Sequence, residues 1–236
     1  MAASQAREAL AMAARSGRGH EPWVFYPQGG RWQWWSFRRG WTEIERWQAV
    51  LERGVRPCVD QAPAPQSSPQ ALCSHLAAAP MEGGTARVFD GLLAPGRLAR
   101  EIVVVTPPVA ASAAEVDRLA VPWLHWCCAN LAVLVLEPSR EALVGSVLWC
   151  RPTVLLAGRE QERSLATAVR ERSRDRDRRA AALVDRLRVL LVAAGDWEVA
   201  SEAPESTLLW RSWGVERRLV CREDTDPSDS PPRSAR

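Results

Sequence analysis

The sequence predicts an α/β protein with a mainly parallel sheet, helices on both faces of that sheet, and an N-terminal β-hairpin followed by a helix. Short apolar runs recur along the chain, and helix-compatible segments separate them; the runs are Glu101–Thr106, Leu131–Leu136 and Thr153–Ala157. Strands that are apolar on both faces and alternate with helices form parallel sheets that are covered on both sides. These runs therefore predict the central sheet.

The N-terminal part predicts the hairpin and its helix. Trp23–Tyr26 has a strand pattern, Pro27–Gly30 supplies turn residues, and Arg31–Trp35 alternates as a returning strand. Ser36 is suited to cap the next helix, in which apolar residues recur every three or four positions until Gly54 ends it.

The remaining elements follow from periodicity and from breaker residues. Residues 61–96 are rich in Pro, Ala, Ser and Gly and predict loops. The other expected elements are helices at Ala71–Ala79, Ser112–Asn130, Arg140–Cys150, Gln161–Glu171, Ala180–Leu187 and Ser206–Trp213, a short strand near Cys58–Val59 and a fourth parallel strand at Arg188–Val192. We expect a helical segment at 1–20, one α/β domain at 21–222 and a disordered tail at 223–236.

Composition excludes some chemistry. All 31 basic residues are arginine, and the formal net charge is only +3. A charge so close to zero gives no strong field for nucleic acid or for a membrane surface. Because lysine is absent, Schiff-base catalysis and a phosphate-loop lysine are excluded.

The cysteines and the apolar segments bear on location. Six cysteines lie scattered without a metal-type repeat, so reduced thiols in a cytoplasmic protein are the simplest interpretation. Met1–Gly19 lacks the apolar core of a secretory signal. Leu119–Leu136 contains Pro122, His125 and Asn130, and it divides into a helix and a strand rather than forming one membrane span.

Two stretches, one rich in tryptophan and one rich in charged residues, each allow a structural and a functional interpretation. Five of the 12 tryptophans lie between Trp23 and Trp41. They could form a stacking platform for bases or sugars, but we favour packing of the hairpin against the next helix. Arg170–Arg179 mixes both signs of charge, which is typical of a solvated helix face and only rarely marks a nucleic-acid site.

The sequence contains no catalytic motif and no metal-binding motif. His125, Cys127 and Cys128 are close in sequence, but on a helix they do not converge into a tetrahedral site, so we expect a buried structural role. A Cys–His pair at Cys73 and His75 would be a coincidence in a loop. We therefore assign no catalytic residue and no metal site.

Four sequence segments occur in the same order as in a known protein family. They are Gly30–Ser36, Ile44–Pro57, Arg151–Gly158 and Leu190–Asp196, within Trp23–Val220. In these segments the chain resembles the N-terminal part of the AMP-dependent synthetases and ligases, the adenylate-forming acyl-CoA synthetase group. The resemblance implies an AMP-binding domain fold, with ATP or AMP and Mg²⁺ as cofactors only if the activity of the family survives.

The motifs that provide the chemistry of that family are missing from this sequence or altered in it. Its phosphate loop would correspond to Gly83, Gly84 and Thr85, which lack the lysine and are also ordinary turn residues. Gly195 lies in the Gly-rich turn after the fourth strand, and Glu223 alone matches the Tyr-Gly-x-Thr-Glu phrase that helps to hold nucleotide and metal. The family's histidine after the first central strand is not found in Pro107–Ala110.

Three functions remain open. The first is a shortened, catalytically degenerate relative of the acyl-CoA synthetase AMP-binding domain, which binds a small carboxylate, a nucleotide fragment, or a partner such as a synthetase. The second is one half of a split carboxylate–CoA ligase that another chain completes. The third, ranked last, is a Trp/Arg-rich nucleic-acid-binding protein.

Overall fold

A computed structural model of the protein describes residues 2–54, 67–78, 102–105, 113–137, 139, 141–193 and 204–220. Within them lies a seven-stranded sheet in the order β2-β1-β4-β3-β5-β6-β7, in which only the β1–β2 pair is antiparallel. The strands are β1 Pro22–Gln28, β2 Arg31–Ser36, β3 Ile102–Val105, β4 Val133–Leu136, β5 Val154–Gly158, β6 Val189–Ala193 and β7 Glu216–Val220. The predicted α/β class with a mainly parallel sheet is confirmed.

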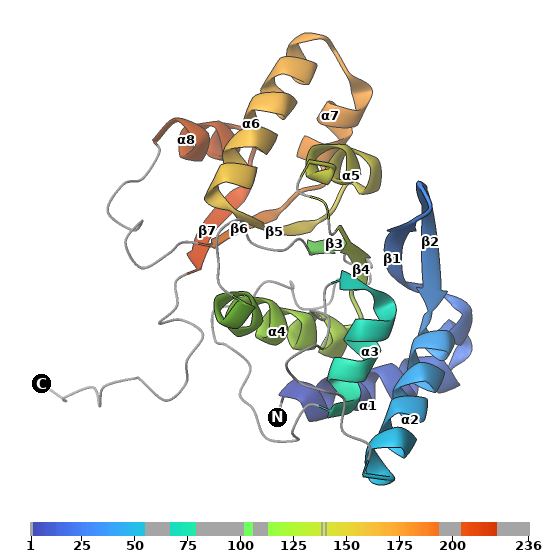
Figure 1. The fold of residues 1–236 in the computed structure, drawn as a ribbon. Coiled ribbons are helices and arrows are strands. Elements are labelled where there is room, and N and C mark those ends of the chain that lie inside the picture. Colours follow the sequence, from blue (N-terminus) through green and yellow to red (C-terminus); the bar gives the residue numbers. More distant parts are fainter. Residues whose placement is uncertain are drawn as a thin grey trace, which may run out of the picture.

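Helices cover both faces of the sheet (Figure 1). One layer contains α1 Ala2–Arg15, the 3₁₀ helix η1 Gly17–His20, α2 Phe37–Glu52, α3 Pro69–Ala78 and α4 Ala113–Ala129. The other contains α5 Leu143–Cys150, α6 Arg159–Arg174, α7 Arg178–Val184 and α8 Pro204–Ser212. Successive residues of β4 serve the two layers, since Leu134 belongs to the first core and Val135 to the second.

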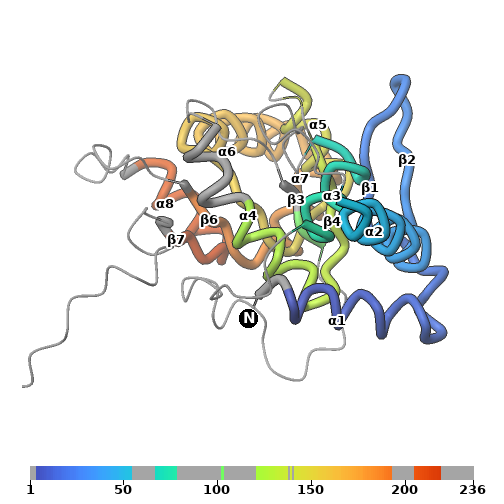
Figure 2. The backbone as a smooth tube through the Cα atoms, turned by 60° about the horizontal axis from the view of Figure 1, so that its bottom comes forward, coloured from blue at the N-terminus to red at the C-terminus, as the bar shows by residue number. Residues whose placement is uncertain are grey.

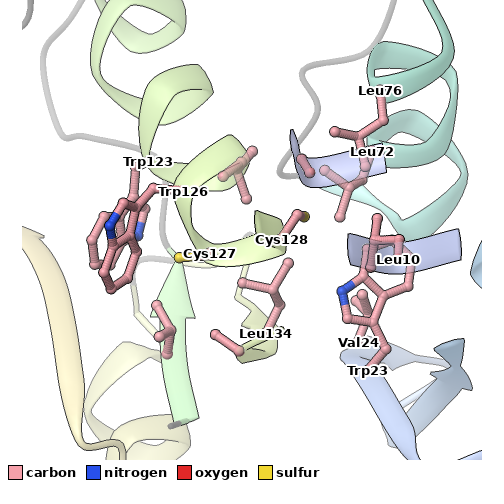
Figure 3. Packing of buried hydrophobic residues seen from close by; sticks show 14 of the residues in the cluster. Leu10, Trp23, Val24, Leu72, Leu76, Trp123, Trp126, Cys127, Cys128 and Leu134 are labelled. Carbon is pink, nitrogen blue, oxygen red and sulfur yellow. The ribbon is translucent and has the colours of Figure 1, made fainter. Parts of the chain in front are cut away.

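The first core is rich in large aromatic residues (Figure 3). Trp23 of β1 is fully buried and stacks on Phe37 with ring centroids 6.3 Å apart. Trp123 and Trp126 of α4 stack at 5.1 Å, and Leu10 of α1 packs in the same cluster. The N-terminal helix is therefore part of the core.

The hairpin and the helix after it follow local sequence signals. Gly29 and Gly30 have φ of +58° and +73°, values that glycine adopts readily in a tight turn. The Ser36 side chain accepts the backbone N–H of Arg39 at 3.2 Å and caps α2, and Gly54 follows the helix with φ +79°. The predicted cap and stop are confirmed.

The structure corrects the sequence prediction at several places. β4 begins only at Val133, after a turn in which Leu131 has φ +53°, and α5 begins at Leu143. The short strand expected near Cys58–Val59 lies outside the described residues. β7 was missed, because its sequence, Glu-Arg-Arg-Leu-Val, starts with three charged residues.

Tryptophans of the hairpin divide between core and surface. Trp23 and Trp35 are buried, as expected, but Trp34 is 48% exposed. Trp32 stacks on Trp149 of α5 with centroids 4.9 Å apart, and Trp149 is itself 46% exposed. β2 forms the outer edge of the sheet in both views (Figures 1 and 2). The core interpretation is thus correct for only part of the group.

Charged residues at 170–179 lie at the surface, as predicted. All but Asp177 are exposed, and Asp177 pairs with Arg172 at 3.7 Å and caps α7 through the backbone N–H of Arg179. In the part of the chain that the structure describes, no helix is long and apolar enough to cross a membrane.

Candidate functional site

Ligands of parallel α/β sheets usually bind beyond the carboxyl ends of the strands. Glu137 lies there, directly after β4, and is only 2% exposed. Its carboxylate accepts the backbone N–H of Ser139 at 2.9 Å and also the hydroxyl of Ser146, a buried residue of α5. A buried carboxylate needs such partners. The Glu137 side chain thus ties β4 to α5.

The carboxyl end of β5 leads directly into α6. Gly158 closes β5, and its backbone N–H donates to Oε1 of Gln161 at 2.8 Å. Since glycine has no side chain to cap a helix, Gln161 supplies one half of a capping box by reaching back. Arg159, at the first helical position, is 8% exposed. This strand end is therefore closed by its own helix.

One turn further, Glu162 of α6 forms a buried ion pair with Arg217 of β7. Nε donates to Oε1 at 2.8 Å and a terminal guanidinium nitrogen donates to Oε2 at 3.2 Å. The two side chains are 2% and 7% exposed, respectively. Two parallel bonds of this kind fix both distance and orientation. The pair fastens the edge strand β7 to the α-helical layer.

Beside these contacts, α6 and α8 leave a pocket of about 410 Å³ between them. Its lining comes from Arg163, Ala166, Thr167 and Arg170 of α6 and from Glu205, Ser206 and Leu209 of α8. Sequence reasoning missed this pocket. The spacing of Arg163 and Arg170 places them on one side of a helix, but no periodicity shows that α8 lies opposite.

The site residues expected from the sequence lie outside the described residues. They are Gly83, Gly84, Thr85, Gly195 and Glu223, and the segment Pro107–Ala110 lies outside as well. Their assignment to a nucleotide or anion stays a prediction. Among the described residues, no group of three or more His, Cys, Asp or Glu could hold a metal ion.

Cys73 and His75 both lie on α3, which corresponds to the helix expected at Ala71–Ala79, so they are not neighbours in a loop. Cys73 donates through its Sγ to the carbonyl of Gly40, at 3.5 Å. Burial raises the pKa of the Cys73 thiol well above its usual range. A thiol with a raised pKa is a poor nucleophile.

His75 faces α4 instead, where its ring centroid is 5.3 Å from that of His125. Burial, the nearby His75 and then Arg7 lower the pKa of His125 to about 4. Burial likewise raises the pKa of the thiols of Cys127 and Cys128. His125, Cys127 and Cys128 are buried, as predicted.

No protein-family model and no curated protein matches the sequence. Thirteen chains of solved structures match this one, among them the following two. One is the crystal structure of CmiS6, which is 13% identical, with a TM-score of 0.55 over 92% of this chain and 71% of that chain. The other is the A domain of carboxylic acid reductase from Segniliparus rugosus, in complex with AMP and a co-purified carboxylic acid. That similarity is weak, at 15% identity and a TM-score of 0.29 over 94% of this chain, which spans 31% of that chain.

Proposed function

We propose that this chain is a catalytically degenerate relative of the AMP-binding domain of acyl-CoA synthetases, and that it works by binding a small ligand or a protein partner. The proposal rests on one observation: polar residues that follow the strand ends form hydrogen bonds and an ion pair within the protein itself. Glu137, Gln161 and Glu162 are all buried and bonded to groups of the same chain.

Adenylate formation requires the opposite arrangement. The ATP phosphates must be clamped and Mg²⁺ must be placed, because charge stabilisation supplies most of the catalysis in phosphoryl-group chemistry. Glu137 and Glu162 are the buried acidic residues that follow β4 and β5, and each would have to give up its partner in order to hold a metal ion. The chain also contains no lysine that could meet a phosphate.

An ATP–pyrophosphate exchange assay with a panel of carboxylic acids tests the proposal, together with calorimetry using ATP·Mg and AMP. We expect no exchange and no binding of ATP·Mg at micromolar concentrations. Exchange by the isolated chain, accompanied by tight ATP·Mg binding, would overturn it. Exchange that appears only when a second protein is added would indicate a split ligase instead.

A further inference from the structure

The pocket between α6 and α8 is hollow because two of its positions carry small side chains. Ala166 is 4% exposed and Ser206 is 8% exposed, so both are buried residues of the lining. Leu209 adds an apolar, half-buried wall. Small residues here leave a volume of about 410 Å³, within the usual range of small-molecule sites.

Two cationic side chains line this volume. Arg163 and Arg170 are exposed and lie seven residues apart on α6, which is two turns, or roughly 10 Å along the helix axis. Within the described part of the chain, neither guanidinium has a hydrogen-bond or ion-pair partner. Arg172 and Arg217, in contrast, pair with Asp177 and Glu162.

The remaining polar groups of the pocket do not cancel this charge. Among the described residues of the lining, Glu205 is the one carboxylate, so with two guanidinium groups these residues carry a formal charge of +1. Thr167 lies between the two arginines on the same side of α6, and its hydroxyl can donate or accept. The pocket thus offers two separated anion receptors, a hydroxyl between them and an apolar wall.

We propose that the α6–α8 pocket binds a small organic molecule with two anionic groups, one on Arg163 and one on Arg170, and with its carbon chain against Ala166 and Leu209. The planar guanidinium matches both carboxylate and phosphate through paired hydrogen bonds, so a dicarboxylate and a bisphosphate share the necessary chemistry. This inference rests on the proposed binding function and names a ligand class for it.

Calorimetric titration of the full chain with octanedioate, octanoate and fructose 1,6-bisphosphate tests the proposal. We expect octanedioate to bind about tenfold more tightly than octanoate, since the second carboxylate adds one charge-assisted contact. Arg163→Gln and Arg170→Gln should each bring octanedioate to the affinity of octanoate. A bisphosphate that binds more tightly than octanedioate would identify phosphate as the natural group, and the reverse order would identify carboxylate.

Two further variants separate the pocket from general electrostatics. Arg211 is exposed on α8, two residues past Leu209 and so on the opposite side of that helix. Arg211→Gln removes the same charge and should leave octanedioate binding unchanged. Thr167→Phe fills the pocket without changing its charge and should abolish binding.

The proposal is overturned if no dianion binds, if octanoate binds as tightly as the tightest dianion, or if Arg211→Gln weakens binding as much as Arg163→Gln does. These outcomes are distinct from a failure of the proposed function, which the ATP·Mg titration and the exchange assay report. Thermal unfolding of each variant confirms that it is folded.

Discussion

Trp23 lies directly on the backbone of Gly40, so close that a β-carbon at position 40 would be 2.2 Å from Cζ3 of the indole and 2.3 Å from Cε3. The indole is fully buried and stacked on Phe37, so it has little room to move away. The contact joins the first strand of the sheet to α2, and it exists only because residue 40 has no side chain.

Gly40→Ala is therefore expected to destabilise the protein, although alanine is the better helix former. Overpacking should cost about 3 kcal/mol, the upper end of the usual range, before the gain in helix propensity of about 1 kcal/mol is subtracted. Urea unfolding followed by tryptophan fluorescence measures the difference.

Gly145→Ala is the matched control, since Gly145 is also helical but a β-carbon at that position would have nothing within 4 Å. It should stabilise the protein by about 0.5–1 kcal/mol. Equal effects of the two substitutions would contradict the close contact at Gly40.

Glu162→Gln should destabilise the fold by about 3 kcal/mol, because it leaves the buried Arg217 guanidinium without a counter-charge. Glu216→Gln breaks a neighbouring but exposed pair with Arg218 and should cost less than about 1 kcal/mol. Replacing both partners, as Glu162→Leu with Arg217→Met, should restore much of the stability. If Glu162→Gln is as mild as Glu216→Gln, the pair is not buried in solution.

His125 should make stability depend on pH. Its folded-state pKa is about 4 against 6.5 for the free side chain, so the unfolded chain binds the proton first as the pH falls. The contribution of His125 to the free energy of unfolding is fully present above pH 6.5 and is lost progressively between pH 6.5 and pH 4. At pH 5 about 2 kcal/mol has been lost. Urea midpoints measured across this range give the slope.

His125→Leu should remove that part of the slope, whereas substitution of the exposed His20, as His20→Gln, should leave it unchanged. A slope that persists in His125→Leu would assign the pH dependence to other groups.

The buried cysteines should resist alkylation. Burial raises the pKa of the thiols of Cys73, Cys127 and Cys128 well above the usual range. It raises the pKa of Cys150 to about 12. Few thiolates therefore form at mildly alkaline pH. Iodoacetamide labelling followed by peptide mass spectrometry should find these four positions unmodified in the native protein and modified in urea. Rapid native labelling of Cys127 or Cys128 would show that α4 opens readily.

Local signals in the sequence were sufficient for much of the fold. Ser36 and Gly54 mark the ends of α2 by their own capping chemistry. The runs at β4 and β5 are apolar at every position because both faces are covered, and that pattern is visible without a structure. Strand order is less accessible, since no local signal states that β1 pairs with β4.

Contacts between distant segments explain what the sequence did not show. β7 carries Glu216, Arg217 and Arg218, and Arg217 becomes an interior residue only because Glu162, on another element, neutralises it. The α6–α8 pocket depends in the same way on which helix faces Arg163 and Arg170. The phosphate-loop remnant at Gly83–Thr85 stays a sequence prediction.

The pairing of β1 with β4 has a consequence for how the protein is made. Val24 lies opposite Leu134, and α1 packs on α4, so the N-terminal elements acquire these two partners only after the middle of the chain has been synthesised. At ordinary translation rates this interval is roughly 5–20 s. During that time Trp23 can pack only on nearby residues such as Phe37, and the nascent chain presents an apolar surface suited to a ribosome-associated chaperone. Synthesis in a chaperone-depleted extract should therefore lower the yield of folded protein more than the stability of the finished fold would suggest.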